Sequence, residues 1–316
     1  VVGTETGVDH SKPVASFVHG LLELPPTMRV FDTQHACYGG TAGVMAAVEW
    51  IASGAAAGRA ALVICADVAR YGMHTAGEPT QGGGAVAMVI AENPAMLELD
   101  VGVTGAASTH VHDFWRPSGQ REARVDGHYS MQCYTEALAT AYRGWKTRAI
   151  ARELVRDGAS SEQLARICYH VPFCKMAKKA HAAVRACDGV ADDPASYQAQ
   201  VEPSLWACSR VGNIYTGSLY LALLGALDRD AATLAGKRIG LFSYGSGCTS
   251  EFFSGVVGAR AAELTAKAKL GEVLADRERI TIDEYERIMT LVTPLENRHA
   301  AFRFTGVDEH RRQYAR

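Results

Sequence analysis

Short apolar runs alternate along this chain with longer segments in which apolar residues recur at helical spacing. The apolar runs occupy residues 60–66, 84–91, 97–104, 167–171, 238–244 and 251–257. Continuous runs such as 60–66 and 84–91 are typical of strands buried on both faces. Helical spacing is found in residues 12–22, 38–53, 130–157, 172–187 and 216–227. The alternation predicts an α/β fold in which helices cover buried sheets.

The two halves of the chain repeat one pattern. Each half contains a buried strand followed by a glycine-rich turn, at residues 69–84 in the first half and 243–247 in the second. No low-complexity linker separates them, so we expect one compact unit with halves at 1–157 and 158–262. Residues 263–316 are richer in charge and are predicted to pack as peripheral helices.

Composition excludes several classes of function. The 316 residues carry a net charge of -2, so no overall excess of positive charge points to nucleic acid or to an anionic membrane surface. An acidic ligand would need a local basic patch. Apolar runs are far shorter than the roughly 20 residues that cross a membrane. Eight cysteines at irregular spacing indicate reduced thiols and a cytoplasmic protein.

Cys37 stands at the predicted start of an apolar helix, among the small residues Gly39, Gly40 and Gly43. The free N–H groups and the dipole of a helix N-terminus stabilise a thiolate, so we expect a lowered pKa and a nucleophile. The nearby glycines would let a substrate carbonyl approach the backbone. The alternative interpretation is a small core cysteine, which is a common role for this residue.

Three further polar residues follow predicted strands or turns. His170 lies at the end of a strand, where α/β proteins place their sites, although a buried structural histidine fits the same pattern. Asn213 follows Gly212 and precedes a helix, so it is either a site residue or a helix cap. Glu5 comes just after an apolar strand remnant, and its alternative interpretation is a surface carboxylate.

Several segments together resemble the 3-hydroxy-3-methylglutaryl-CoA synthase family of the thiolase superfamily. The four main segments are residues 3–9, 36–42, 170–176 and 211–216, and further matches lie at 67–84, 113–117 and 242–247. The resemblance covers nearly the whole chain in the order of the family. The first strand and helix of the family have no counterpart, so the resemblance implies an N-terminally truncated sequence. It also implies a thiolase-like five-layer αβαβα sandwich of two similar halves, usually found as a homodimer.

The resemblance implies a role for each matching residue. Cys37 matches the nucleophile that accepts the acyl group, Glu5 the base that removes a methyl proton, and His170 the residue that polarises the second substrate. Asn213 matches an amide that helps to bind the second substrate. Ser246 matches a position whose backbone N–H forms an oxyanion hole with that of Cys37, and Tyr71 matches a side chain that lines the site of the acyl group. A thioester on cysteine keeps its α-carbon acidic enough to enolise, which suits a Claisen-type condensation.

A basic patch lies close to His170 in the sequence. Lys175, Lys178 and Lys179 are spaced i, i+3 and i+4, so they share one side of the predicted helix 172–187. They suit the phosphates of coenzyme A or an acidic acyl-carrier protein. The alternative is an ordinary solvated helix face.

Four functions remain in competition. The first is condensation of acetyl-CoA with acetoacetyl-CoA, which segments 77–81 and 114–117 favour; no cofactor beyond these thioesters is implied. The second is the polyketide β-branching version on carrier-protein thioesters, which segment 246–253 favours. The third is a ketoacyl synthase, which would not need Glu5, and the fourth is a catalytically inactive scaffold. His110, His112 and His128 lack the cysteine or carboxylate partners of a metal site, so no metal is expected.

Overall fold

Two four-stranded sheets form the centre of the molecule. The computed structural model describes residues 1–291, 302–309 and 311–315. The first sheet has the order β2 (Asp32–Thr33), β1 (Val2–Gly3), β3 (Ala61–Val68) and β4 (Gly83–Ile90). The second has the order β5 (Leu97–Ser108), β10 (Thr249–Val257), β9 (Arg238–Gly245) and β8 (Arg166–Tyr169).

The strand directions bring chemistry-bearing loops to the same ends of the sheets. In the first sheet β1 runs parallel to β2 and β3, and β4 is antiparallel to β3. In the second, β8 runs parallel to β9, and β10 is antiparallel to both β9 and β5. The carboxyl ends of β1 and β3 therefore lie side by side, and so do those of β8 and β9.

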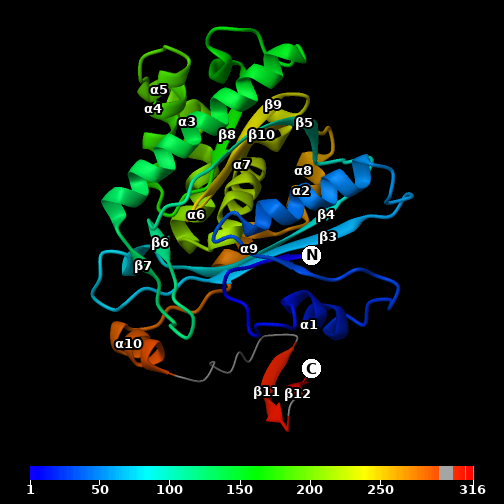
Figure 1. Cartoon of the computed structure of the whole chain (residues 1–316), viewed down its shortest axis with the longest axis vertical. Coiled ribbons are helices and arrows are strands. Elements are labelled where there is room, and N and C mark those ends of the chain that lie inside the picture. Colours follow the sequence, from blue (N-terminus) through cyan, green and yellow to red (C-terminus); the bar gives the residue numbers. More distant parts are fainter. Residues whose placement is uncertain (292–301, 310, 316) are drawn as a thin grey trace.

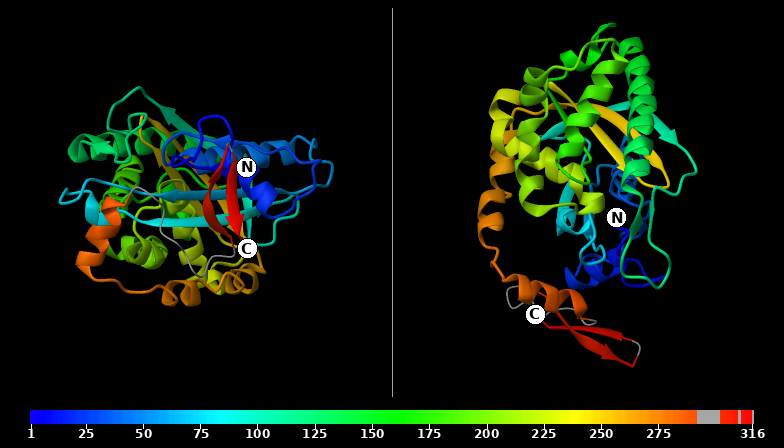
Figure 2. Two further views of the ribbon diagram at one scale, coloured as in Figure 1. Left: turned by 90° about the horizontal axis from the view of Figure 1, so that it is seen from below. Right: turned by 90° about the vertical axis from the view of Figure 1, so that its left-hand side faces the viewer.

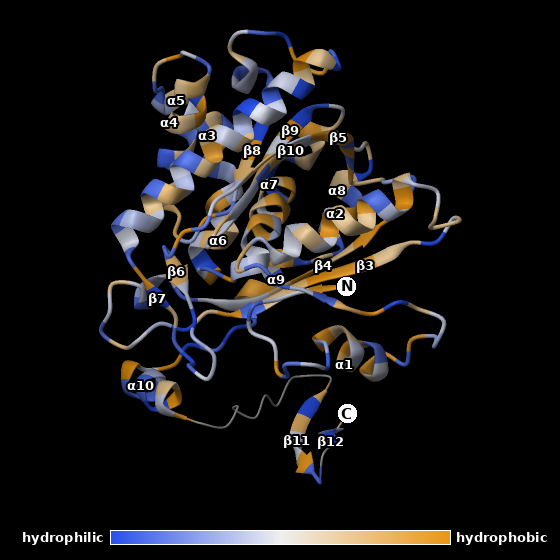
Figure 3. Cartoon of the chain, viewed as in Figure 1, coloured by the Kyte–Doolittle hydropathy of each residue, from blue (hydrophilic) through white to orange (hydrophobic). Residues whose placement is uncertain are grey.

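Helices separate and cover the two sheets, which gives the layers seen in Figures 1 and 2. The helices α2 (Gly39–Ala52) and α7 (Ser218–Leu234) lie between the sheets, and α3 (Gly127–Ala151) and α4 (Lys175–Cys187) cover the outer side of the second sheet. On the far side of the first sheet lies α1 (Val14–Leu21). The arrangement is the thiolase-like αβαβα sandwich that the sequence predicts, and the apolar colour of the strands and of α2 in Figure 3 marks its interior.

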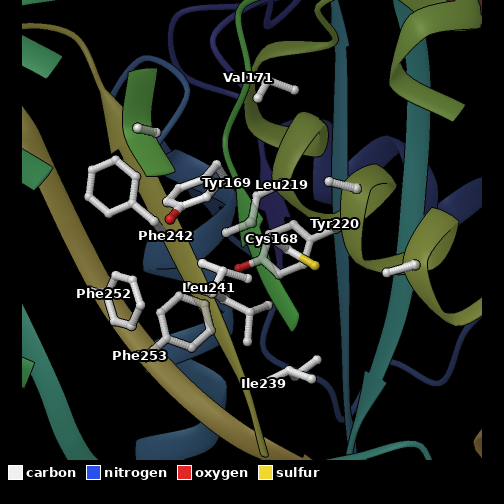
Figure 4. Close-up of a cluster of buried hydrophobic side chains, with 14 of the residues drawn as sticks. Cys168, Tyr169, Val171, Leu219, Tyr220, Ile239, Leu241, Phe242, Phe252 and Phe253 are labelled. Carbon is white, nitrogen blue, oxygen red and sulfur yellow. The ribbon is translucent and has the colours of Figure 1, made fainter. Parts of the chain in front are cut away.

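The helix α3 shows why the layers pack so closely. Tyr134, Leu138, Tyr142 and Trp145 recur at three- to four-residue spacing along α3 and are buried against the second sheet. A Cβ at Gly105 of β5 would lie only 1.9 Å from the Ala141 carbonyl oxygen, so only glycine permits this contact. Figure 4 shows the aromatic and aliphatic side chains of β8, β9, β10 and α7 that fill the adjoining core.

The strand β4 departs from the prediction of a strand buried on both faces. It lies at the edge of the first sheet. Val86, Met88 and Ile90 pack against the core, whereas Ala85 and Val89 are exposed, Val89 by 72%. The apolar run therefore encodes one buried and one uncovered face, a distinction that hydrophobicity alone does not make.

The segment after residue 262 is helical only in part. It forms α8 (Ala261–Ala266), α9 (Leu270–Ala275) and α10 (Ile282–Thr290), and then a hairpin of β11 (Arg303–Asp308) and β12 (Arg311–Ala315). The prediction of peripheral helices is therefore wrong for the hairpin. Residues 292–301, which the same prediction covers, lie outside the described part of the chain. The predicted helix 130–157 begins earlier and ends at Ala151. The shorter elements are β6 (Phe114–Trp115), β7 (Arg124–Val125), α5 (Pro194–Gln200) and α6 (Leu205–Val211).

Candidate active site

Cys37 lies in the turn that leads into α2, between the two sheets. Ala36 adopts a positive φ of 39°, and the amide of Tyr38 donates to the carbonyl of His35 at 2.9 Å, so the turn is tight. The Cys37 side chain is buried in a small apolar cluster with Ala69, Tyr71, Phe114 and Tyr215. The rings of Tyr71 and Tyr215 meet that of Phe114 edge-on, with centroids 6.3 and 5.8 Å apart. This cluster places aromatic walls around the thiol, and it is called the acyl pocket below after the role that the resemblance implies for Tyr71.

Glu5 faces Cys37 directly. It follows β1, is 8% exposed, and its Oε1 accepts a hydrogen bond from Cys37 Sγ at 3.7 Å. Burial and the negative charge of Asp67 raise the pKa of Glu5 to about 8, against the opposing effects of Arg116 and of the hydrogen bond from Cys37. A surface carboxylate is therefore excluded, and Glu5 has the position and the pKa of a general base that acts near neutral pH.

The carboxylate of Asp67 holds the Glu5 loop in place. It lies at the end of β3, and its Oδ1 accepts from the Glu5 amide at 2.9 Å, from Thr4 Oγ1 at 2.8 Å, and from the amide and hydroxyl of Thr6 at 3.0 and 2.7 Å. Its Oδ2 accepts from the amide and hydroxyl of Thr216. Asp67 thus joins the loop after β1 to the loop before α7. The prediction missed it as a site residue, although a charged residue that closes an apolar strand was the available signal.

The pKa of Cys37 differs from the prediction. Burial raises it well above the ordinary thiol value, and the nearby charges of Glu5 and Asp67 raise it further. The pKa is therefore raised, and the expectation of a lowered pKa is wrong. The resting side chain is a thiol whose proton points at Glu5, and a proton must leave when Cys37 attacks.

The glycines after Cys37 contact protein backbone, where we expected them to admit a substrate. A Cβ at Gly40 would lie 2.7 Å from the Thr216 carbonyl oxygen and 2.6 Å from Cys65 Sγ. A Cβ at Gly3 would lie 2.4 Å from Gly40 Cα. These glycines therefore let β1, α2 and the turn before α7 meet at Cys37.

His170 directly follows β8, at the carboxyl end predicted for a site residue. Its amide donates to the Phe242 carbonyl of β9 at 2.7 Å, and its own carbonyl accepts from the Tyr134 hydroxyl at 2.8 Å. The side chain is 2% exposed, and burial lowers its pKa to about 3. His170 is consequently a neutral imidazole that can donate an N–H without carrying charge.

Asn213 closes the turn before α7 and also contacts Tyr71. Its Oδ1 accepts from the Tyr215 amide and from Ser218 Oγ, both at 2.9 Å, although the N-cap of α7 is Gly217. Burial raises the pKa of Tyr71 to about 12, and side-chain hydrogen bonds with Tyr215 and Asn213 oppose this rise. Tyr71 is 7% exposed and packs in the same cluster as Cys37.

Ser246 lies in the turn between β9 and β10, next to the loop that carries Cys37. A Cβ at the neighbouring Gly245 would lie 2.6 Å from the Tyr38 amide nitrogen, so the two loops touch. Asp113 anchors this turn, because it is fully buried and accepts from the Gly247 amide at 3.0 Å and the Tyr244 hydroxyl at 2.7 Å. Asp113 belongs to segment 113–117 of the resemblance, but its role in holding this turn was not predicted.

The three lysines lie on the surface of α4, five to nine residues after His170. Lys175, Lys178 and Lys179 are exposed and line a cavity of about 620 Å³ together with Cys174, Tyr197, Glu202, Leu205, Trp206 and Ser209. The structure therefore brings the predicted basic side together beside an apolar floor. The three lysines lie on the solvent-exposed side of α4.

Two classes of site find no support in the described part of the chain. No three or more histidine, cysteine, aspartate or glutamate side chains gather there in a way that could hold a metal ion. The His110 and His112 rings stack edge-on with centroids 4.8 Å apart. Among the described helices, none has the length and apolar character needed to span a bilayer.

Two family models match the chain. The model for the N-terminal part of hydroxymethylglutaryl-coenzyme A synthase matches residues 1–95, and the model for the C-terminal part matches residues 97–195 and 192–313. The chain belongs to the hydroxymethylglutaryl-coenzyme A synthase family. The resemblance inferred from the sequence is confirmed.

Individual relatives in this family place the match on almost the whole chain. A hydroxymethylglutaryl-CoA synthase from Enterococcus faecalis is 38% identical over 90% of this chain and 72% of its own length. The structure of MvaS in complex with 3-hydroxy-3-methylglutaryl coenzyme A is 60% identical, with a TM-score of 0.95 over 99% of this chain and 80% of that one. The curacin pathway HMG synthase in complex with acetyl donor-ACP is 30% identical, with a TM-score of 0.90 over 99% of this chain and 81% of that one. This chain is therefore shorter than these relatives.

Proposed function

We propose that the chain is a hydroxymethylglutaryl-CoA synthase that condenses an acetyl group on Cys37 with acetoacetyl-CoA. The observation that carries the proposal is the buried pair of Cys37 and Glu5, joined at 3.7 Å inside the acyl pocket. A ketoacyl synthase would have no use for a buried base at this place. An inactive scaffold would gain nothing from a carboxyl group buried beside a thiol, where burial makes its ionisation costly.

In the first step Cys37 Sγ attacks the carbonyl carbon of acetyl-CoA. The thiol proton passes to a base, for which Glu5 stands in hydrogen-bond contact, and the sulfur of coenzyme A leaves and takes up a proton. The product is an acetyl thioester on Cys37. The backbone N–H groups of Cys37 and Ser246 are the proposed oxyanion donors, and one such donor is worth about 3–4 kcal/mol.

In the second step the Glu5 carboxylate removes a proton from the acetyl methyl group. The resulting enolate carbon attacks the ketone carbon of acetoacetyl-CoA, whose oxygen accepts the N–H of His170 and takes up a proton as the new C–C bond forms. The side-chain amide of Asn213 helps to hold this second substrate. Water then hydrolyses the Cys37 thioester and releases 3-hydroxy-3-methylglutaryl-CoA.

The donor of the acetyl group is proposed to be coenzyme A. Lys175, Lys178 and Lys179 line one cavity and suit the phosphates of coenzyme A, and the similar MvaS structure contains a coenzyme A ester. The curacin HMG synthase in complex with acetyl donor-ACP supports the alternative, a carrier-protein donor. Acetylation of Cys37 from acetyl-CoA and from an acetyl-carrier protein separates the two, and efficient transfer from the carrier protein alone contradicts our choice.

The assembly is proposed to be a homodimer, which is the usual assembly that the family resemblance implies. The location is proposed to be the cytoplasm, since all eight cysteines are unpaired thiols.

Stoichiometric acetylation of Cys37 tests the proposed function. On mixing with acetyl-CoA, intact-protein mass spectrometry should show one acetyl group on the wild type and none on Cys37→Ala. Addition of acetoacetyl-CoA should discharge it as 3-hydroxy-3-methylglutaryl-CoA. A chain that acetylates on Cys37 but condenses only a malonyl thioester would be a ketoacyl synthase, and no acetylation from any thioester would indicate a scaffold.

A further inference from the structure

One hydroxyl group connects the C-terminal helix α10 to the wall of the acyl pocket. The Tyr285 hydroxyl accepts from Gln81 Nε2 at 2.5 Å and donates to Glu78 Oε1 at 2.8 Å. Glu78 begins a single 3₁₀ turn, Glu78–Thr80, in the loop between β3 and β4, and Gln81 directly follows it. Figure 1 shows α10 as a separate helix below this loop, some 200 residues further along the chain. Tyr285 therefore holds the turn at both of its ends.

Gln81 transmits this contact inward. Its Oε1 accepts the backbone amide of Tyr71 at 3.1 Å, so the two ends of one side-chain amide join Tyr285 to Tyr71. The backbone of Gln81 forms a parallel bridge with Asn213, and the Asn213 amide donates to the Thr80 carbonyl at 2.8 Å. The turn thus lies directly behind two residues assigned to substrate binding.

The same turn also supports the Tyr71 ring. A Cβ at Gly77 would lie 2.9 Å from that ring, so the backbone of the turn is in contact with its face. The other side of Tyr71 packs on Phe114 in the acyl pocket. The position of the turn therefore fixes how far the ring extends toward Cys37.

Charge strengthens the contact on the side of Glu78. The hydrogen bond from Tyr285 is the main cause that lowers the Glu78 pKa, and the His74 amide, which donates at 2.6 Å, adds to it. A hydroxyl bond to an ionised carboxylate is stronger than one between neutral groups. At the end of α10, Arg121 donates to the Leu291 carbonyl at 2.7 Å and gives the helix a second attachment.

We infer that Tyr285 is a positioning residue that sets the acyl-chain selectivity of the Cys37 site, acting through Gln81 on Tyr71. The inference rests on the proposed function, because it concerns the acyl group that Cys37 accepts. Without the hydroxyl, the turn and the Tyr71 ring lose a fixed support, and the pocket tolerates one more methylene. Acyl length is the property that changes, since Tyr285 touches neither Cys37 nor Glu5.

The test is the ratio of two Cys37 acylation rates, with propionyl-CoA and with acetyl-CoA. One methylene in a tight pocket gives about 10- to 200-fold discrimination, so we expect Tyr285→Phe to raise the propionyl-to-acetyl ratio by about 3- to 10-fold. The matched control is Thr290→Val, which removes a hydroxyl of the same helix that only donates to the Arg287 carbonyl. Thr290→Val should leave the ratio unchanged.

A double-mutant cycle tests the route through Gln81. If Tyr285 acts through Gln81, adding Tyr285→Phe to Gln81→Leu changes the ratio less than Tyr285→Phe changes it alone. Should Tyr285→Phe not fold, Glu78→Gln weakens the same hydroxyl contact and should shift the ratio in the same direction.

Two results would overturn the inference about Tyr285, and a third would contradict only the proposed function on which it rests. An unchanged ratio in folded Tyr285→Phe, or an equal shift in Thr290→Val, shows that Tyr285 does not set selectivity. Wild-type chain that takes up no acyl group on Cys37 from either thioester contradicts the proposed function instead. The acetyl arm of the same experiment therefore separates the two failures.

Discussion

The pair of Glu5 and Cys37 combines a base that is hard to ionise with a nucleophile that is hard to deprotonate. Burial is the largest cause in both cases, and the charge of Asp67 raises the pKa of both groups. Glu5 is neutral well below its pKa of about 8 and a carboxylate above it. Because only the carboxylate can remove a methyl proton, we expect kcat for condensation to rise with pH and to level off above about 8. A rate that is flat between pH 6 and 9 would contradict this.

Glu5→Gln provides the control for that profile. It keeps the shape of the side chain and removes the base, so condensation should fall by about 10²- to 10⁴-fold and lose its rise with pH. Single-turnover discharge of pre-acetylated enzyme by acetoacetyl-CoA measures this step alone. Condensation at the wild-type rate in the variant would remove Glu5 from the mechanism.

Asp67 offers a sharper test, because it acts on Glu5 by charge and by position. Asp67→Asn removes a negative neighbour that raises the Glu5 pKa, so the rise of kcat should move to lower pH. The variant should also lose about 1–3 kcal/mol of stability, since an amide cannot accept every hydrogen bond that the carboxylate accepts from Thr4, Thr6 and Thr216. The pH profile and urea unfolding measure the two effects separately, and an unshifted or upward-shifted profile would contradict the electrostatic account.

At the scale of residues, the sequence predicted which side chains gather at Cys37 better than it predicted their pKa values. Cys37, Glu5 and Tyr71 were chosen from motifs, and the structure brings all three to one pocket. The thiol pKa was predicted in the wrong direction, because helix-start patterns do not show burial or the charge of a residue 30 positions away. Asp67 was missed for a related reason: its hydrogen bonds come from loops that are distant in the sequence.

At the scale of elements, the start of α2 is where three backbones meet. Gly40 packs against Gly3 of β1 on one side and the Thr216 carbonyl on another. We expect Gly40→Ala to cost about 1–3 kcal/mol by overpacking and to slow Cys37 acetylation, because the helix start must move. Urea unfolding and the acetylation burst measure these effects.

Gly20→Ala is the matched control for that substitution. Gly20 lies inside α1, and a Cβ there would meet nothing within 4 Å. Alanine should therefore stabilise the helix by up to about 1 kcal/mol and leave acetylation unchanged. If both variants behaved alike, the packing of Gly40 would not explain its effect.

Element types were predictable from hydrophobic spacing, whereas element environments were not. The runs at 238–244 and 251–257 became β9 and β10 almost as predicted, since both are buried in the second sheet. The run at 84–91 has the same appearance but became the edge strand β4. The hairpin of β11 and β12 escaped prediction because its strands contain no continuous apolar run and their residues are at least partly exposed.

At the scale of the whole molecule, the layers bring loops of the two sheets together. Glu5 and Cys37 come from the first sheet and the start of α2, and the turn after β9 that carries Ser246 touches the Cys37 loop. Cross-layer hydrogen bonds fix this meeting, such as Tyr38 to Glu251 of β10 at 2.8 Å. The sequence indicated the α/β class, and the resemblance supplied the five layers, but neither contained the register between the layers.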